Sequence, residues 1–206
     1  MHELSYPIPH TSYLYLGGLM DRQILSELIG RGICETGIEG TYRSVSRSTA
    51  GDYPSLGISQ WEGARAEHLL LAITGGEYFT GKSHSQLSAE GRIGGLMALL
   101  DSPSGRLAQQ QLLAADAVSY VDALAGAGLS DSRCIIYAGM WCPTSTSVVC
   151  TFIWNRRHHG NLDDLPFLHM LFREKYAHAA DVMEYEAGYR NRAERTYEWV
   201  LGLSLA

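Results

Sequence analysis

A chain of 206 residues that is 46% hydrophobic and 18% charged has the composition of a folded globular protein rather than a disordered one. Its formal net charge of −6 argues against a general nucleic-acid-binding protein, because such proteins are normally basic. No apolar stretch approaches the roughly 20 residues of a membrane-spanning helix. We therefore expect neither a nucleic-acid partner nor membrane insertion.

Turn signals divide the chain into helical segments with one short β excursion. Asp21 predicts the N-cap of a helix over about 22–35, and Gly37 predicts its end. Residues 41–59 predict a small hairpin or irregular loop. Further helices are expected at 63–73, 88–100, 104–125, 131–141, 145–158 and 165–203, with a break near Gly188. The expected fold is one mainly α-helical domain over 19–206, after an N-terminal extension over 1–18.

The four cysteines are too few and too scattered for a disulfide scaffold. Cys142 and Cys150 flank a Ser/Thr-rich turn and are close enough in sequence to pair, but buried free thiols are the favoured interpretation.

Glu35, at the end of the first predicted helix, is the main candidate for catalysis. At about 100° per residue it falls within roughly 20° of Ile24 and Leu28, which would place it on the apolar stripe. Burial disfavours a charged carboxyl group and keeps its proton available for general acid catalysis. The alternative is an exposed Glu35 at a frayed helix end, or one paired with Arg31. Glu39 is a competing candidate, although it lies beyond Gly37, where the helix is expected to end.

Asp52, on the polar segment that follows, is the candidate second carboxylate. Glycoside cleavage commonly uses two carboxyl groups, the second acting as a nucleophile, as a stabiliser of positive charge or as a base for water. The alternative is a structural Asx turn before Pro54.

The segment that follows Asp52 carries candidate sugar-binding residues. Gly57 permits close approach of the backbone to a ligand, and the Gln60 amide can bind both carbonyl and hydroxyl groups. Trp61 offers an apolar plate for a sugar ring, although core packing at a helix start is the favoured explanation of a tryptophan there.

Taken together, these segments resemble the lysozyme-like peptidoglycan hydrolases of phages and Gram-positive bacteria, of the endolysin or tail-associated lysin type. In that group a helix ends in Glu-Ser/Thr-Gly, and Tyr-x-Ser-Val and Ser-x-Gly-x-x-Gln-Trp segments follow. This chain has Glu35-Thr36-Gly37, Tyr42-Arg43-Ser44-Val45 and Ser55-Leu56-Gly57-Ile58-Ser59-Gln60-Trp61. The likeness extends over about 20–160, through Gly105–Gln109, Asp116, Tyr120 and Ile135–Ala138.

The resemblance implies a lysozyme-like helical fold and cleavage of peptidoglycan glycan strands, with Glu35 as general acid. It implies that Asp52 assists, that Ser55, Gly57, Gln60 and Trp61 bind substrate, and that Tyr137 packs against the catalytic glutamate. No cofactor or metal is expected. The partners would be peptidoglycan and possible phage or injection-device proteins. Because the N-terminus lacks the pattern of a secretory signal, delivery to the wall is expected through a holin, a phage particle or lysis.

The match departs from the family pattern over Ser46–Asp52, where a loop richer in Asn and Asp is expected. Hydrolysis by two carboxylates and lytic transglycosylation by Glu35 alone therefore both stay open. So does a non-catalytic wall-binding or phage structural module.

A more distant alternative is nucleotide binding, because Gly76–Ser83 matches the P-loop pattern Gly-x-x-x-x-Gly-Lys-Ser. That motif needs a strand before it, for which Leu69–Ile73 is the candidate, and a helix after it. The bulky Tyr78 and Phe79 within the turn argue against it. His158, His159 and His169 do not have a convincing metal-ligand spacing.

Overall fold

The computed structural model describes residues 21–48 and 50–205, and the expected extension over 1–18 lies outside them. The described residues are mainly helical, as predicted. The helices are α1 (Arg22–Thr36), α2 (Gly63–Leu71), α3 (His84–Ala89), α4 (Ile93–Asp101), α5 (Pro103–Gly126), α6 (Ser132–Gly139), α7 (Cys142–Arg156), α8 (Leu165–Ala179) and α9 (Glu186–Leu201). Short 3₁₀ turns lie at η1 (Gly57–Ser59), η2 (Gly76–Phe79) and η3 (Met183–Tyr185).

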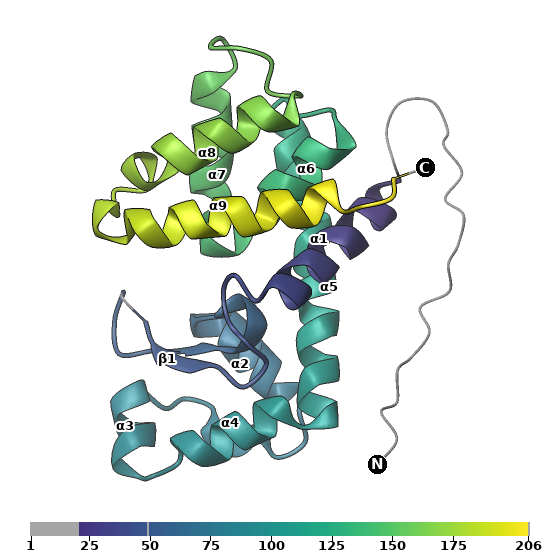
Figure 1. The fold of residues 1–206 in the computed structure, drawn as a ribbon. Coiled ribbons are helices and arrows are strands. Elements are labelled where there is room, and N and C mark those ends of the chain that lie inside the picture. The colour runs from purple at the N-terminus through teal and green to yellow at the C-terminus, as the bar shows by residue number, and fades with distance from the viewer. Residues whose placement is uncertain (1–20, 49, 206) are drawn as a thin grey trace.

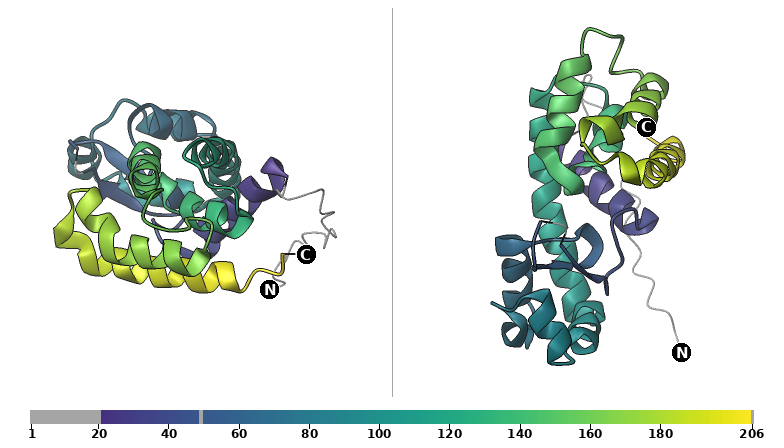
Figure 2. Two further views of the ribbon diagram at one scale, coloured as in Figure 1. Left: turned by 90° about the horizontal axis from the view of Figure 1, so that it is seen from above. Right: turned by 90° about the vertical axis from the view of Figure 1, so that its left-hand side faces the viewer.

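The β excursion is a two-stranded antiparallel hairpin in the predicted region. Strand β1 (Val45–Arg47) pairs with β2 (Pro54–Leu56), and Ser46 lies opposite Ser55. The hairpin, α2, α3 and α4 form one end of the molecule, and α6 to α9 form the other (Figure 1). Helix α5 runs between the two ends, and α1 packs along it (Figures 1 and 2).

The first helix begins and ends as its sequence predicts. The Asp21 side chain accepts a hydrogen bond from the Gln23 backbone N–H, which satisfies one of the free donors of the first turn. Gly37 ends the helix in the left-handed region at φ 57°, and its N–H bonds the Ile33 carbonyl. A glycine enters this region without the steric cost of a Cβ atom, so the chain turns sharply here.

Two of the predicted helices differ from the prediction in where the chain breaks. The segment predicted as one helix over 88–100 is two helices, separated at Gly91 with φ 67°. The predicted break near Gly188 is wrong, because Gly188 lies inside α9. The chain turns instead around Asp181, which has φ 57°. Helices α8 and α9 then lie side by side (Figure 2).

One continuous cluster of buried hydrophobic side chains extends through both ends of the molecule. An aromatic group of Tyr137, Trp141, Phe152, Phe172 and Tyr176 fills the part beneath α8. All four cysteines are free thiols, as favoured from the sequence. No helix of the described residues is long and apolar enough to cross a membrane.

Candidate functional site

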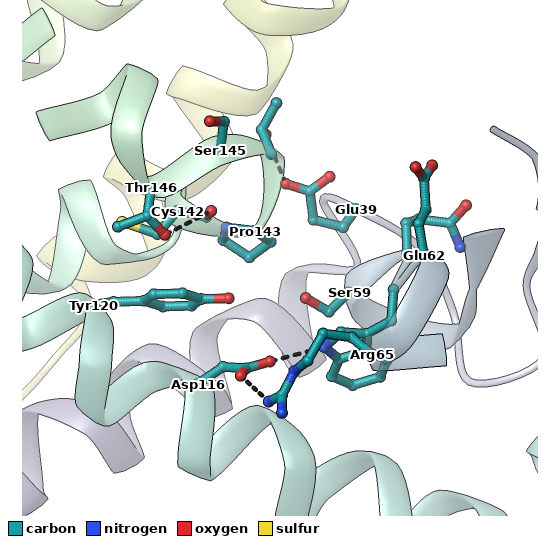
Figure 3. A pocket seen from close by; sticks show the side chains of 13 residues that line it. Glu39, Ser59, Glu62, Arg65, Asp116, Tyr120, Cys142, Pro143, Ser145 and Thr146 are labelled. Carbon is teal, nitrogen blue, oxygen red and sulfur yellow. Dashed lines mark hydrogen bonds and ion pairs between the residues drawn. The ribbon is translucent and has the colours of Figure 1, made fainter. Parts of the chain in front are cut away.

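A pocket of about 510 Å³ lies where the two ends of the molecule meet. Four stretches of chain line it: the turn after α1, the segment from η1 into α2, the middle of α5, and the start of α7 (Figure 3). Its lining residues are Glu39, Ser59, Gln60, Trp61, Glu62, Arg65, Asp116, Tyr120 and Cys142 to Thr146. Three carboxylate side chains and two large aromatic rings therefore share one cavity.

Glu39 reaches this pocket because the chain turns at Gly37. The Glu39 side chain is only 13% exposed and forms an ion pair with the guanidinium of Arg192. It also accepts a hydrogen bond from the Thr144 hydroxyl, with 3.0 Å between the oxygens. The carboxylate is thus held in the pocket wall by groups from the start of α7 and from α9.

Arg192 is itself fixed from several sides. Only 7% of its side chain is exposed, and it donates to the Thr144 hydroxyl and the Met140 carbonyl, each at 2.7 Å. Its guanidinium lies over the Trp141 ring, 4.6 Å from the centroid. A cation with so many partners is pre-organised, so the carboxylate that it binds has a defined position.

Asp116, on α5, anchors the opposite wall. Its two carboxylate oxygens accept from the Trp61 indole N–H, at 2.8 Å, and from the Arg65 guanidinium (Figure 3). Trp61 is 6% exposed and lines the pocket, so the core and ligand roles proposed for it are compatible.

Glu62 is the third carboxylate of the pocket. Its oxygens accept hydrogen bonds from the hydroxyls of Ser48 and Ser55. Glu62 belongs to none of the ion pairs found in the part of the chain that the structure describes. Ser55, expected to bind substrate, is 4% exposed and supports Glu62 from behind instead of lining the pocket.

Gly57 and Gln60 lie at the two ends of the η1 turn beside the pocket. Gly57 has φ 70°, and a Cβ atom there would lie 2.1 Å from Oε1 of Gln109. The close approach that was expected toward a ligand is therefore made by the protein's own glutamine. Gln60 does line the pocket, with its amide donating to the Gly57 carbonyl and accepting from the Ser46 hydroxyl.

Gln109, on α5, is fully buried and joins three segments around the pocket. Its Oε1 accepts from the Ile58 N–H at 3.0 Å, and its amide nitrogen donates to the carbonyls of Tyr42 and Leu100. A buried amide with all these partners fixes the η1 turn against α5.

Tyr120, on α5, is the tyrosine of the pocket, whereas Tyr137 is not. Tyr137 is fully buried, packs edge-on against Phe172 and lies 3.3 Å from Nδ1 of His169. The expectation that Tyr137 faces the site is therefore wrong. Tyr120 points its hydroxyl into the cavity (Figure 3), and burial, together with the nearby Asp116, raises the pKa of that hydroxyl.

Glu35 lies outside the pocket lining, and the expectation that it continues the buried stripe is wrong. Its side chain is 55% exposed and lies 3.7 Å from the Arg31 guanidinium, the pairing weighed as the alternative. It also accepts from the Trp199 indole at 2.8 Å. Leu28, one heptad earlier and at nearly the same azimuth, is buried, but Glu35 lies in the last turn of α1, where this edge of the helix is exposed.

Asp52 also lies outside the pocket lining and has a structural environment. Its carboxylate accepts from the Ser85 hydroxyl at 2.8 Å and lies 3.2 Å from the Arg47 guanidinium. Hydrogen bonds from Ser83 and Ser85 hold its pKa below the usual range. These contacts tie the hairpin to the start of α3, so the structural interpretation fits better than a second catalytic carboxylate.

The P-loop alternative lacks its required surroundings. Residues 69–71 are helical in α2, and the sheet of the described residues is the antiparallel hairpin. Lys82 pairs with Glu90, and Ser83 caps α3. Among residues 21–48 and 50–205 there is no group of three or more His, Cys, Asp or Glu side chains suited to a metal ion.

Comparison of the chain with protein-family models, with curated proteins and with solved structures found no match. The site is therefore defined by its own geometry. Of the residues proposed from sequence, the structure brings Gln60 and Trp61 to the pocket. It also brings there Glu39, the competing candidate from the sequence, and it shows Arg192 as the partner of Glu39, which no sequence pattern predicts.

Proposed function

We propose that the protein cleaves the glycan strands of peptidoglycan in this pocket, with Glu39 as the acid/base carboxyl group. The observation that carries the proposal is the position of Glu39: a largely buried carboxylate, fixed by Arg192 and Thr144, in a cavity that also holds two other carboxylates and two aromatic rings. Glycosidic bonds are cleaved by carboxyl groups held beside the bond in a water-poor cleft.

The pocket also suits a sugar polymer in its other properties. Trp61 and Tyr120 supply apolar ring surface, while Gln60 and Ser59 supply amide and hydroxyl groups that can bond sugar hydroxyls. The motif resemblance to lysozyme-like phage lysins points to peptidoglycan and to a lysozyme-like fold. In this proposal the catalytic role that the resemblance assigns to Glu35 passes to Glu39.

Glu62 is the candidate second carboxylate of a hydrolase. Asp116 accepts from the Arg65 guanidinium and the Trp61 indole, whereas Glu62 accepts from the Ser48 and Ser55 hydroxyls and belongs to no ion pair of the described residues. An exposed carboxylate at the pocket rim is suited to activating a water molecule.

Lytic transglycosylation is the second candidate function, favoured by the location of Asp52 outside the pocket. In that reaction one carboxyl group acts first as acid and then as base, and a hydroxyl of the substrate replaces water. Mass spectrometry of the products separates the two reactions. Anhydromuramyl ends indicate a transglycosylase, and new reducing ends indicate a hydrolase.

The test is release of soluble fragments from purified peptidoglycan of several chemotypes by wild type, Glu39→Gln and Glu35→Gln. The proposal expects cleavage by wild type, loss of it in Glu39→Gln and retention in Glu35→Gln. No release by wild type from any wall would favour a binding or structural module. Loss in Glu35→Gln with retention in Glu39→Gln would restore the assignment derived from the motif.

A further inference from the structure

A second hollow of about 590 Å³ lies beside the pocket. Thr146 lines both cavities. The second hollow lies between the end of α5, with Ala123, Gly126 and Ala127, and the outer face of α7, with Cys150 and Trp154. Its lining is mostly apolar and made of small side chains, apart from Trp154.

Trp154 is half exposed at the far end of this hollow, which is unusual for the largest apolar side chain. The Arg157 guanidinium lies over its ring, 3.8 Å from the centroid. The exposed His158 and His159 follow Arg157 in the chain, whereas the Arg156 guanidinium lies over the Phe152 ring and lines another cavity. A small-residue groove beside the pocket thus ends at an aromatic ring and a guanidinium group.

We propose that this groove binds the peptide stem of peptidoglycan while the glycan strand occupies the pocket, an inference that rests on the proposed function. Stem peptides are short, rich in alanine and carry free carboxylates. Small apolar side chains fit the groove, and the carboxylates would meet Arg157 at its end. The occupant must join the glycan at the pocket, and Thr146 lies at that junction.

The length of the groove agrees with this occupant. Helix α7 departs from helical geometry at Ser145 (φ −174°, ψ 109°) and is continuous after it. From Thr146 to Trp154 the helix rises about 12 Å, and about 16 Å to Arg157, at 1.5 Å per residue. An extended peptide of about four or five residues spans about 13–18 Å.

The test compares intact peptidoglycan with the same walls stripped of peptides by an amidase. Wild type should cleave intact walls with a kcat/KM about tenfold higher than stripped glycan, which corresponds to about 1.4 kcal/mol. Trp154→Ala should remove this preference and leave cleavage of stripped glycan unchanged. Gly126→Phe should do the same by filling the groove, because a Cβ at Gly126 meets nothing within 4 Å.

Gly188→Phe is the matched control, since Gly188 is also an exposed helical glycine with open space around it and lies outside the groove. This variant should keep the wild-type preference. Equal activity of wild type on both substrates, or an unchanged preference in both groove variants, would overturn the proposal.

A binding measurement separates this proposal from the proposed function. The Glu39→Gln protein should sediment with intact walls more than with stripped glycan, and Trp154→Ala in that background should abolish the difference. If wild type cleaves neither substrate but stem-dependent binding persists, the groove assignment stands and the catalytic proposal fails. Equal sedimentation with both substrates contradicts the groove assignment.

Discussion

Glu35 and Glu39 lie on either side of one turn, and their surroundings are opposite. The Glu35 side chain is 55% exposed and pairs loosely with Arg31, whereas the Glu39 side chain is 13% exposed and pairs with the buried Arg192. Both carboxylates contact α9, Glu35 through Trp199 and Glu39 through Arg192. One therefore joins two helices at the surface, and the other faces a cavity.

The turn at Gly37 causes this difference. Up to Thr36, helical geometry fixes the direction of each side chain, and it directs Glu35 along the edge marked by Leu28, which is buried earlier in the helix but exposed in the last turn. After Gly37 the backbone changes direction, so the azimuth of the helix no longer applies. A carboxylate enters the pocket because the helix ends before it, and not because it continues an apolar stripe.

The largest expected effect concerns catalysis. Glu39→Gln should lower kcat on purified peptidoglycan by at least about 100-fold, the usual scale of lost general acid–base catalysis. The glutamine keeps the size of the side chain and an oxygen that accepts from Thr144. Glu35→Gln, the matched change on the other side of the turn, should leave kcat within about twofold. Comparable losses in the two variants would erase the proposed distinction.

The next effect concerns stability. Arg192→Met should lower the free energy of unfolding by about 3 kcal/mol, because it leaves a largely buried carboxylate without its cation. Arg31→Met removes the partner of an exposed carboxylate and should cost at most about 1 kcal/mol. Urea denaturation of both variants checks the difference. Similar midpoints would mean that the two ion pairs are equally exposed to solvent.

A smaller effect is expected at the turn itself. Gly37→Ala should destabilise the protein by about 1 kcal/mol, because alanine is disfavoured at φ 57°. It should also lower activity, because Glu39 follows the turn. Gly30→Ala is the control within α1: its Cβ would lie 3.9 Å from the nearest atom, so it should stabilise by about 0.5–1 kcal/mol. Thermal unfolding should show a lower melting temperature for Gly37→Ala and a higher one for Gly30→Ala.

The sequence was sufficient for the parts of this region that depend on local geometry. Asp21 and Gly37 predicted the two ends of α1, because capping needs only the residue and its neighbours. The hairpin was also placed correctly. The Gly188 break was wrong because a glycine inside a helix costs only about 1 kcal/mol, which the packing of α9 against α8 outweighs.

The parts that depend on long-range contacts could not be predicted. Arg192 joins Glu39 from far along the chain, and periodicity indicates that a face is buried without naming its partner. The buried contacts of Gln109 and Asp116 could not be predicted for the same reason, since a polar residue on a helix is ordinarily solvated. Glu39 carried a weaker signal: it was a carboxylate just beyond a helix end, and the stripe argument ranked it second.

The smallest effect on activity is expected at Asp52. Asp52→Asn should leave cleavage within about twofold, because the carboxylate is bound by Ser85 and Arg47 away from the pocket lining. Its effect should appear in the pH dependence of unfolding. Since the pKa of Asp52 is lower in the folded protein than its usual 3.8, the unfolded chain takes up this proton first as the pH falls. The stability that Asp52 contributes is thus present above about pH 4 and lost below it, and Asp52→Asn should flatten that decline. A large loss of activity in Asp52→Asn would instead show that Asp52 is the second catalytic carboxylate. The bond that is cleaved would then lie nearer the hairpin.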